Sequence, residues 1–161
     1  MLQNAGVVVD ANQMTTPNFT LFEEAILDDN IKIVKFLMPT ANLGRINQYG
    51  GHIFFFMEGA GKNWREIASL LPKESQELKL LVNHPNTNGE YPLRQAAYFG
   101  NVDYCRFLVE EWGANVSATY NGRTAADIAE DPVPFFKVQQ TQEISTLISQ
   151  KNIQFGKIFR Y

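Results

Sequence analysis

Few side chains in this sequence are of the types that usually do chemistry, and their spacing builds no catalytic or metal site. His52 and His84 lie 32 residues apart, which matches no spacing of metal ligands. Cys105, the single cysteine, lies in a stretch with helical apolar spacing, where a buried and unreactive thiol is the usual outcome. We therefore predict no catalytic residues, no metal and no cofactor, and we expect that the chain is not an enzyme.

One short glycine-rich segment contains part of a phosphate-binding motif. The segment Gly59-Ala60-Gly61-Lys62 has the Gly-Lys pair of that motif, but Asn63 stands where the motif needs serine or threonine, and Phe56 stands where it needs glycine. Without these residues the loop lacks both the tight turn and the hydroxyl that binds a metal ion. We therefore expect a turn between two helices here.

Two charged patches have both a structural and a functional interpretation. The acidic residues Glu23, Glu24, Asp28 and Asp29 form either a solvated helix face or a contact for a basic partner. In the last eleven residues, Lys151, Lys157 and Arg160 alternate with aromatic residues, a mixture that can bind single-stranded nucleic acid. Three charges are few for that role, and a terminal helix with lysines reaching into solvent explains them equally well.

Composition limits the class of protein further. Apolar residues make up 45% of the 161-residue chain, which is enough for a packed core, and the net charge is −3. That charge disfavours nonspecific binding to nucleic acid or to an anionic membrane. No apolar run approaches the roughly 18 residues that cross a bilayer, and no basic residue precedes Lys32 as a signal peptide would need. With one cysteine, a reducing and cytoplasmic location is expected.

The elements that position these residues follow from an internal repeat. The strongest pattern runs from Asn88 to Ala129, in which Gly89 and Gly122 are 33 residues apart. Asn-Gly suits a tight hairpin tip, and Pro92 suits the first turn of a helix. Gly100 can end that helix. A second helix follows, with an apolar face at Val102, Cys105, Leu108 and Val109, and Gly113 ends it.

This segment resembles the ankyrin repeat. Tyr91-Pro92-Leu93-Arg94 stands where the family has Thr-Pro-Leu-His, and Thr124-Ala125-Ala126-Asp127 stands there in the next unit. The family's threonine and histidine are largely missing, which weakens the expected hydroxyl–imidazole bonding and leaves the helical pattern intact. The resemblance implies an all-α ankyrin-repeat solenoid of about four helix-turn-helix units.

Two weaker units precede the clear one, so we expect an array over residues 18–150 with units starting near residues 18, 50, 89 and 122. The second unit is then about six residues longer than a 33-residue repeat. Helices are expected at 52–58, 63–71 and 74–82, with Pro72 separating the last two. Either the second unit contains an inserted helical turn, which we favour, or its first helix is 63–71 and residues 50–61 form a long loop.

Both ends of the array depart from the pattern. Residues 135–149 are expected to form a helix that covers the last unit, with Phe136, Gln140, Ile144, Leu147 and Ile148 on one face. The tail 151–161 either packs on the array or is a docking peptide. Residues 1–17 fit no repeat, and three consecutive valines at 7–9 leave a strand, a packed segment or a flexible leader open.

The resemblance implies that another protein binds to the hairpin tips and to the concave row of first helices. On these surfaces we expect partner contacts from Tyr49, Glu90, Gln95, Tyr98, Phe99, Tyr120, Asn121 and Arg123. Packing of Phe99 against the next unit is an equally good interpretation of that residue. We expect a monomer that binds neither nucleic acid nor membrane.

Two biological settings stay open. The chain is rich in Asn, Gln, Ile, Lys and Phe, and it resembles ankyrin-type effectors that intracellular bacteria secrete into a host cell. Alternatively, it is a regulatory or targeting fragment of a larger enzyme.

Overall fold

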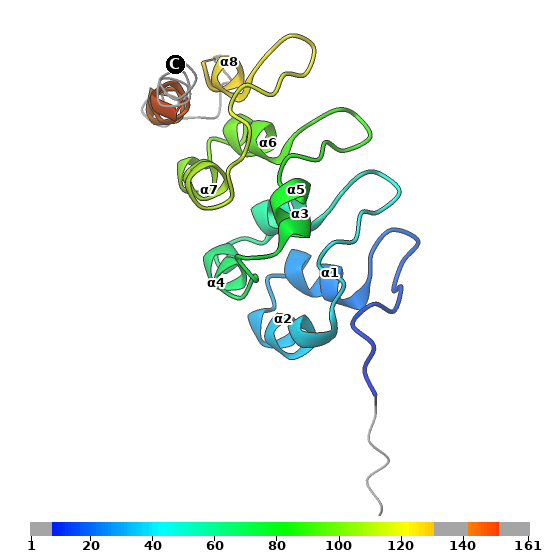
Figure 1. The fold of residues 1–161 in the computed structure, drawn as a ribbon. Coiled ribbons are helices and arrows are strands. Elements are labelled where there is room, and N and C mark those ends of the chain that lie inside the picture. Colours follow the sequence, from blue (N-terminus) through cyan, green and yellow to red (C-terminus); the bar gives the residue numbers. More distant parts are fainter. Residues whose placement is uncertain (1–7, 131–141, 152–161) are drawn as a thin grey trace, which may run out of the picture.

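The computed structural model describes residues 8–130 and 142–151, and within these ranges the chain is helical, with two isolated β-bridges and no strand. The helices stack in two rows, one pair upon the next (Figure 1). The inner row holds α1 (Leu21–Leu27), α3 (Ile53–Gly59), α6 (Pro92–Tyr98) and α8 (Ala125–Ala129). The outer row holds α2 (Ile31–Leu37), α4 (Trp64–Ser69), α7 (Val102–Arg106) and the helical residues 142–151. The predicted all-α solenoid of paired helices is confirmed.

Most of the helices begin at a residue whose side chain accepts a hydrogen bond from the first turn. Thr20 and Glu23 form a reciprocal capping box on α1, and Thr124 and Asp127 form the same box on α8. The second helices of two units use asparagine, because Asn30 caps α2 and Asn101 caps α7. These local bonds fix where each short helix starts, and packing then stabilises helices that are too short to persist alone.

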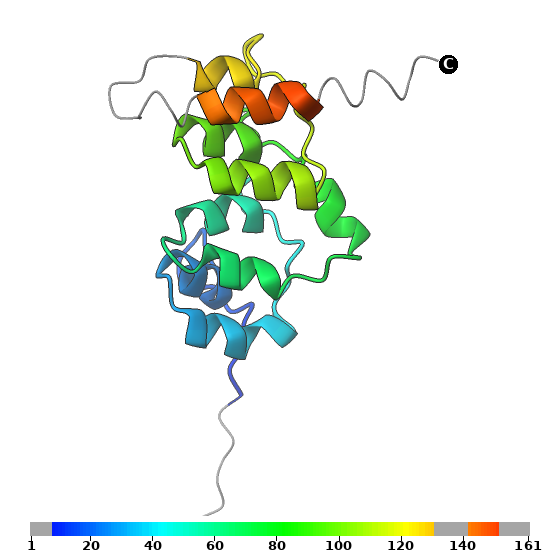
Figure 2. The ribbon, with the colours of Figure 1, turned by 90° about the vertical axis from the view of Figure 1, so that its left-hand side faces the viewer.

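The second unit is enlarged by an additional helix. The four inner helices begin at Leu21, Ile53, Pro92 and Ala125, so that successive starts are 32, 39 and 33 residues apart. The additional residues form α5 (Gln76–Leu81), which is capped by Ser75 and lies beside the two rows (Figure 2). Residues 53–59 are helical, so the alternative of a long loop at 50–61 is wrong, and the inserted helical turn follows the second helix of the unit.

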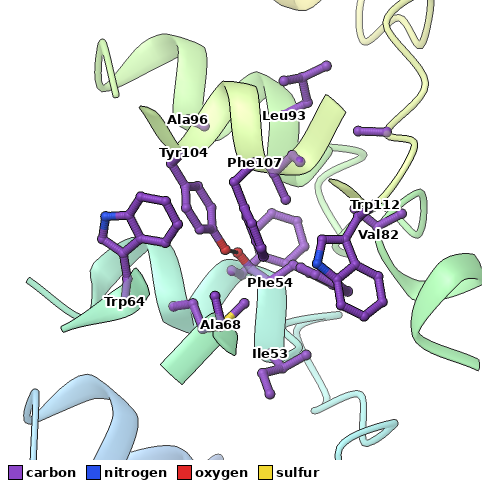
Figure 3. Close-up of a cluster of buried hydrophobic side chains, with 14 of the residues drawn as sticks. Ile53, Phe54, Trp64, Ala68, Val82, Leu93, Ala96, Tyr104, Phe107 and Trp112 are labelled. Carbon is purple, nitrogen blue, oxygen red and sulfur yellow. Dashed lines mark hydrogen bonds between the residues drawn. The ribbon is translucent and has the colours of Figure 1, made fainter. Parts of the chain in front are cut away.

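Aromatic side chains fill the layer between the second and third units (Figure 3). The ring of Trp64 meets the ring of Tyr104 edge-on, with centroids 4.8 Å apart, and Phe107 stacks on Tyr104 and also contacts Trp64. The buried Tyr104 hydroxyl donates a hydrogen bond of 2.6 Å to the main-chain oxygen of Phe54. One polar bond is thereby made inside an otherwise apolar layer, which fixes α7 over α3.

The loops that precede the inner helices project together from one side of the stack (Figure 1). We call them fingers one to four, and they comprise residues 10–20, 41–52, 82–91 and 113–124. The first finger contains residues 10–17, which the sequence places in a leader. There the main-chain oxygen of Ala11 accepts a hydrogen bond from the N–H of Phe22, and the Ala11 side chain is fully buried. Val8 and Val9, before this finger, are exposed.

At the other end, residues 142–151 lie against the last unit (Figure 2). Ile144, Leu147 and Ile148 are buried on the face that the sequence predicts, and the Ser145 hydroxyl donates a hydrogen bond to Glu130. The predicted helix start near residue 135, the face residues Phe136 and Gln140, and the tail beyond Lys151 lie outside the described residues.

Candidate protein-binding surface

The eight residues expected to contact a partner lie on one side of the stack. Tyr49 is in the second finger, and Glu90 is at the end of the third. Tyr120, Asn121 and Arg123 form the tip of the fourth finger, while Gln95, Tyr98 and Phe99 belong to the end of α6. Which of these side chains can contact a partner depends on their exposure and on the hydrogen bonds and ion pairs that they already make within the chain.

The second and third fingers end in the same asparagine-based turn. The Asn47 side-chain oxygen accepts hydrogen bonds from the N–H groups of Tyr49 and Gly51, and the Asn86 oxygen accepts them from Asn88 and Glu90. Such bonds let an asparagine side chain replace part of a backbone turn. Each tip therefore has a fixed shape before any partner binds.

The two fingers also touch backbone to backbone. The N–H and the hydroxyl of Thr87 each donate a 3.0 Å hydrogen bond to the main-chain oxygen of Tyr49. Gly50 has φ +74°, and a Cβ built there would lie 2.6 Å from the Cα of Asn86. Only glycine fits between the fingers at this point. The Tyr49 ring remains 57% exposed beside the contact.

Arg94 connects the third finger to the fourth. Its guanidinium binds both carboxylate oxygens of Glu90, at 2.9 and 3.1 Å, and donates to the main-chain oxygen of Arg123 at 3.1 Å. It also lies over the ring of Tyr120, 5.2 Å from the ring centre. Three expected contact residues are therefore joined by a buried arginine, and Glu90 already has a cationic partner within the chain.

Sequence reasoning missed this role of Arg94. The residue occupies the position of the family's histidine, and its spacing of four from Glu90 is the spacing at which opposite charges pair on a helix. That spacing could have predicted the Glu90–Arg94 ion pair from the sequence. No sequence pattern predicts the contact of Arg94 with the next finger, because that contact depends on how two fingers stack.

The fourth finger tip is a tight turn in which Asn121 and Gly122 both have positive φ, 51° and 75°. Tyr120 and Arg123 pair across it by two main-chain hydrogen bonds. Two consecutive positive φ values define the hairpin turn for which Asn-Gly is the preferred sequence. The expected Asn-Gly tip is present here, whereas at Asn88-Gly89 only the glycine has positive φ.

Tyr98 and Phe99 form an exposed aromatic pair at the end of α6. Their rings meet edge-on with centroids 5.4 Å apart, and the two residues are 51% and 50% exposed. Together with Glu90, Arg94 and Gln95 they line a shallow hollow of about 240 Å³. Half of each aromatic surface thus remains in water, although both residues touch the array.

Glu58, which the sequence did not single out, lies near Phe99. It lines a second hollow of about 450 Å³ with Phe99, Gly100, Asn101, Val102 and Asp103. Its carboxylate accepts a hydrogen bond of 3.4 Å from Gln95 and another from the Asn101 side chain. Partial burial raises the pKa of Glu58, because the charged form is poorly solvated there.

The residues first considered for chemistry have structural surroundings. The buried His52 ring bonds through Nε2 to the main-chain oxygen of His84, and burial lowers the pKa of His52 to about 4. Burial raises the pKa of the Cys105 thiol. Within residues 8–130 and 142–151, no three His, Cys, Asp or Glu side chains are grouped as metal ligands.

The glycine-rich loop after α3 is a turn between two helices, as expected. Gly61 has φ +59°, and the N–H groups of Lys62 and Asn63 donate to the carboxylate of Asp29 in the unit below. Glu23 is likewise used internally, because it caps α1 and pairs with Arg45 at 2.6 Å. Two of the four residues in the acidic patch therefore join the first unit to the second, Glu23 through Arg45 of the second finger and Asp29 through the turn after α3.

Two findings place the chain among known proteins. Stacked helix pairs with fingers on one side define a helical-repeat solenoid, whose continuous surface is suited to binding other macromolecules. Residues 88–121 match the family model of the ankyrin repeat. The chain thus contains an ankyrin repeat, and its fold is an ankyrin-repeat solenoid. No helix in the part that the structure describes has the length and apolar character to span a membrane.

Proposed function

The ankyrin repeat is a protein–protein interaction module, and we propose that this chain binds a partner protein through its fingers and through the ends of its inner helices. The observation that carries the proposal is the half-exposed pair Tyr98 and Phe99, which lines a hollow together with Glu90 at the end of the third finger. Aromatic residues at a rigid, partly desolvated surface contribute most to the affinity of many interfaces.

The internal contacts divide the eight expected residues into two groups. Tyr49, Gln95, Tyr98, Phe99 and Asn121 present side chains to the partner. Glu90, Tyr120 and Arg123 act mainly through their connection to Arg94, which holds the third and fourth fingers in register. A rigid arrangement of fingers lowers the entropy cost of binding.

The test is affinity capture with the purified chain as bait and identification of the captured proteins by mass spectrometry. The double variant Tyr98→Ala/Phe99→Ala should lose the specific partner, with a fall in affinity of about tenfold or more. The matched control is Ile33→Ala/Phe36→Ala, which removes two exposed apolar side chains from the outer helix α2. Equal capture by both variants would contradict the proposed surface.

We further propose that the chain acts as a monomer in a cytosol and that its setting is that of an effector delivered into a host cell. The bias toward Asn, Gln, Ile, Lys and Phe supports this setting. A reporter fused to the chain and expressed in an intracellular bacterium should reach the host cytosol only when the secretion system is intact. Retention in the bacterium would favour the alternative, in which the chain regulates or targets a larger enzyme.

A further inference from the structure

We propose that the two hollows lined by Phe99 form one groove, the Phe99 groove (Glu58, Gln95, Tyr98, Phe99 and Asn101), which binds a lysine or arginine side chain of the partner. The inference rests on the proposed function, because it specifies what that surface binds. Phe99 lines both hollows, and Gln95 lines the first while it donates a hydrogen bond to Glu58 in the second.

The apolar side of the groove fits a cation as well as an alkyl chain. Tyr98 and Phe99 meet edge-on, so their ring faces point in different directions, and about half of each residue is exposed. An arginine or lysine can place its methylene groups on one ring and its charge over a ring face. A partner with a purely apolar side chain would use only the first of these contacts.

The polar side of the groove carries an unmatched negative charge. Within the described residues Glu58 accepts hydrogen bonds from two neutral side chains, Gln95 and Asn101, and makes no ion pair. The neutral donors hold the carboxylate at the edge of the groove without cancelling its charge. Partial burial raises the pKa of Glu58 because its ionised form is poorly solvated, and a cation beside the carboxylate would favour that form.

The neighbouring charges do not supply that counter-charge. Arg94 is bound to Glu90, and Arg65 is bound to Asp103 at 3.0 Å. Each of these ion pairs is neutral overall, so Glu58 gives the groove a net negative charge. An acidic or phosphorylated partner segment would be repelled at this position, whereas a basic side chain would gain a charge-assisted hydrogen bond and a contact with the rings.

A random peptide library displayed on phage, selected against the full chain, tests the inference. We expect enriched peptides to share one Lys or Arg, and we expect its replacement by norleucine or citrulline to weaken binding about tenfold. Glu58→Gln should cause a similar loss with the same peptides. The peptide change and Glu58→Gln together should then cost little more than either one alone, because both remove the same interaction.

The matched control is Glu66→Gln, which neutralises an exposed carboxylate on the outer helix α4 and should leave peptide affinity unchanged. Enriched peptides that need Tyr98 and Phe99 but share no basic residue would overturn the inference and leave the proposed function standing. A selection that yields no peptide dependent on Tyr98 and Phe99 would count against both. Equal affinity of wild type and Glu58→Gln for a basic peptide would place that peptide's charge elsewhere.

Discussion

The junction between the second and third units is stabilised by different interactions from those at the tip of the fourth finger. At the junction, finger backbones touch at Gly50, a buried tyrosine bonds across the layer, and a neutral histidine is enclosed. In the fourth unit the inner helix has a capping box, and nothing lies within 4 Å of a Cβ built at Gly122. Long-range packing therefore fixes the tip of the second finger at Gly50, whereas local hydrogen bonds fix the Asn121-Gly122 turn at the tip of the fourth.

The difference shows why two glycines with nearly equal backbone angles have unequal consequences. Gly50 and Gly122 have φ of 74° and 75°, so both occupy a conformation that side chains disfavour. Only Gly50 also lies against the backbone of another unit. The stability of an array is approximately a sum of contributions from the units and from the interfaces between them. Gly50 therefore reports on an interface, and Gly122 reports on the stability of a single unit.

The largest expected effect is that of Gly50→Ala. The added methyl group would meet the backbone of Asn86 and Thr87, which cannot rotate away, and the residue would be strained at positive φ. We expect the free energy of unfolding to fall by about 3 kcal/mol. Urea denaturation followed by circular dichroism measures this loss. A loss below about 1 kcal/mol would mean that the fingers separate easily.

Acidification should weaken the junction next. Burial holds the pKa of His52 in the folded chain at about 4, below the ordinary histidine value of 6.5, so the unfolded chain binds more protons between these values. The contribution of His52 is therefore intact above pH 6.5 and is lost as the pH falls toward 4. Between pH 7 and pH 5 this amounts to about 2 kcal/mol.

The measurement compares the unfolding free energy of wild type and His52→Gln at pH 7 and pH 5. The raised pKa of Glu58 acts in the opposite direction, but it is present in both proteins and cancels in the difference. Wild type should lose more stability than the variant over this range. Parallel pH profiles would show that the buried ring is not responsible.

Tyr104→Phe should produce a smaller loss at the same junction. The change removes the hydroxyl that bonds to the Phe54 carbonyl and leaves the contacts of the ring with Trp64 and Phe107. We expect a destabilisation of about 1–2 kcal/mol by urea denaturation. Tyr49→Phe is the matched control, because its ring is exposed in the second finger, and its effect should be near zero. Equal effects of the two changes would mean that the buried bond contributes nothing net.

Sequence patterns predicted the local parts of this molecule well, and the physical reason is that those parts depend on neighbouring residues. Helix starts follow from Thr20, Thr124 and Pro92, and the Asn121-Gly122 turn follows from residues that tolerate positive φ. The added helix in the second unit was foreseen as an excess of residues interrupted by Pro72. Its place beside the stack was not foreseen, because only packing determines it.

The candidate surface was less predictable, since burial and pairing join distant positions. Glu90 looked available in the sequence, but Arg94 occupies its carboxylate. Glu58 was not singled out from the sequence, because its unmatched charge depends on the α6–α7 turn that lies against it in the fold. The spacing of four residues between Glu90 and Arg94 indicates that these two residues can pair. No sequence pattern predicts the contact between Glu58 and Gln95, because 37 residues separate them.

The smallest expected effect tests the local character of the fourth finger. In Gly122→Ala the new methyl group points into open space, so only the positive φ opposes it, and we expect a loss of about 1 kcal/mol by urea denaturation. Gly122→Asn should cost less than Gly122→Ala, because asparagine tolerates this conformation better. If Gly122→Ala proved as damaging as Gly50→Ala, the Asn121-Gly122 turn would also be held by a packed neighbour. The distinction between a packed tip of the second finger and a locally held tip of the fourth would then fail.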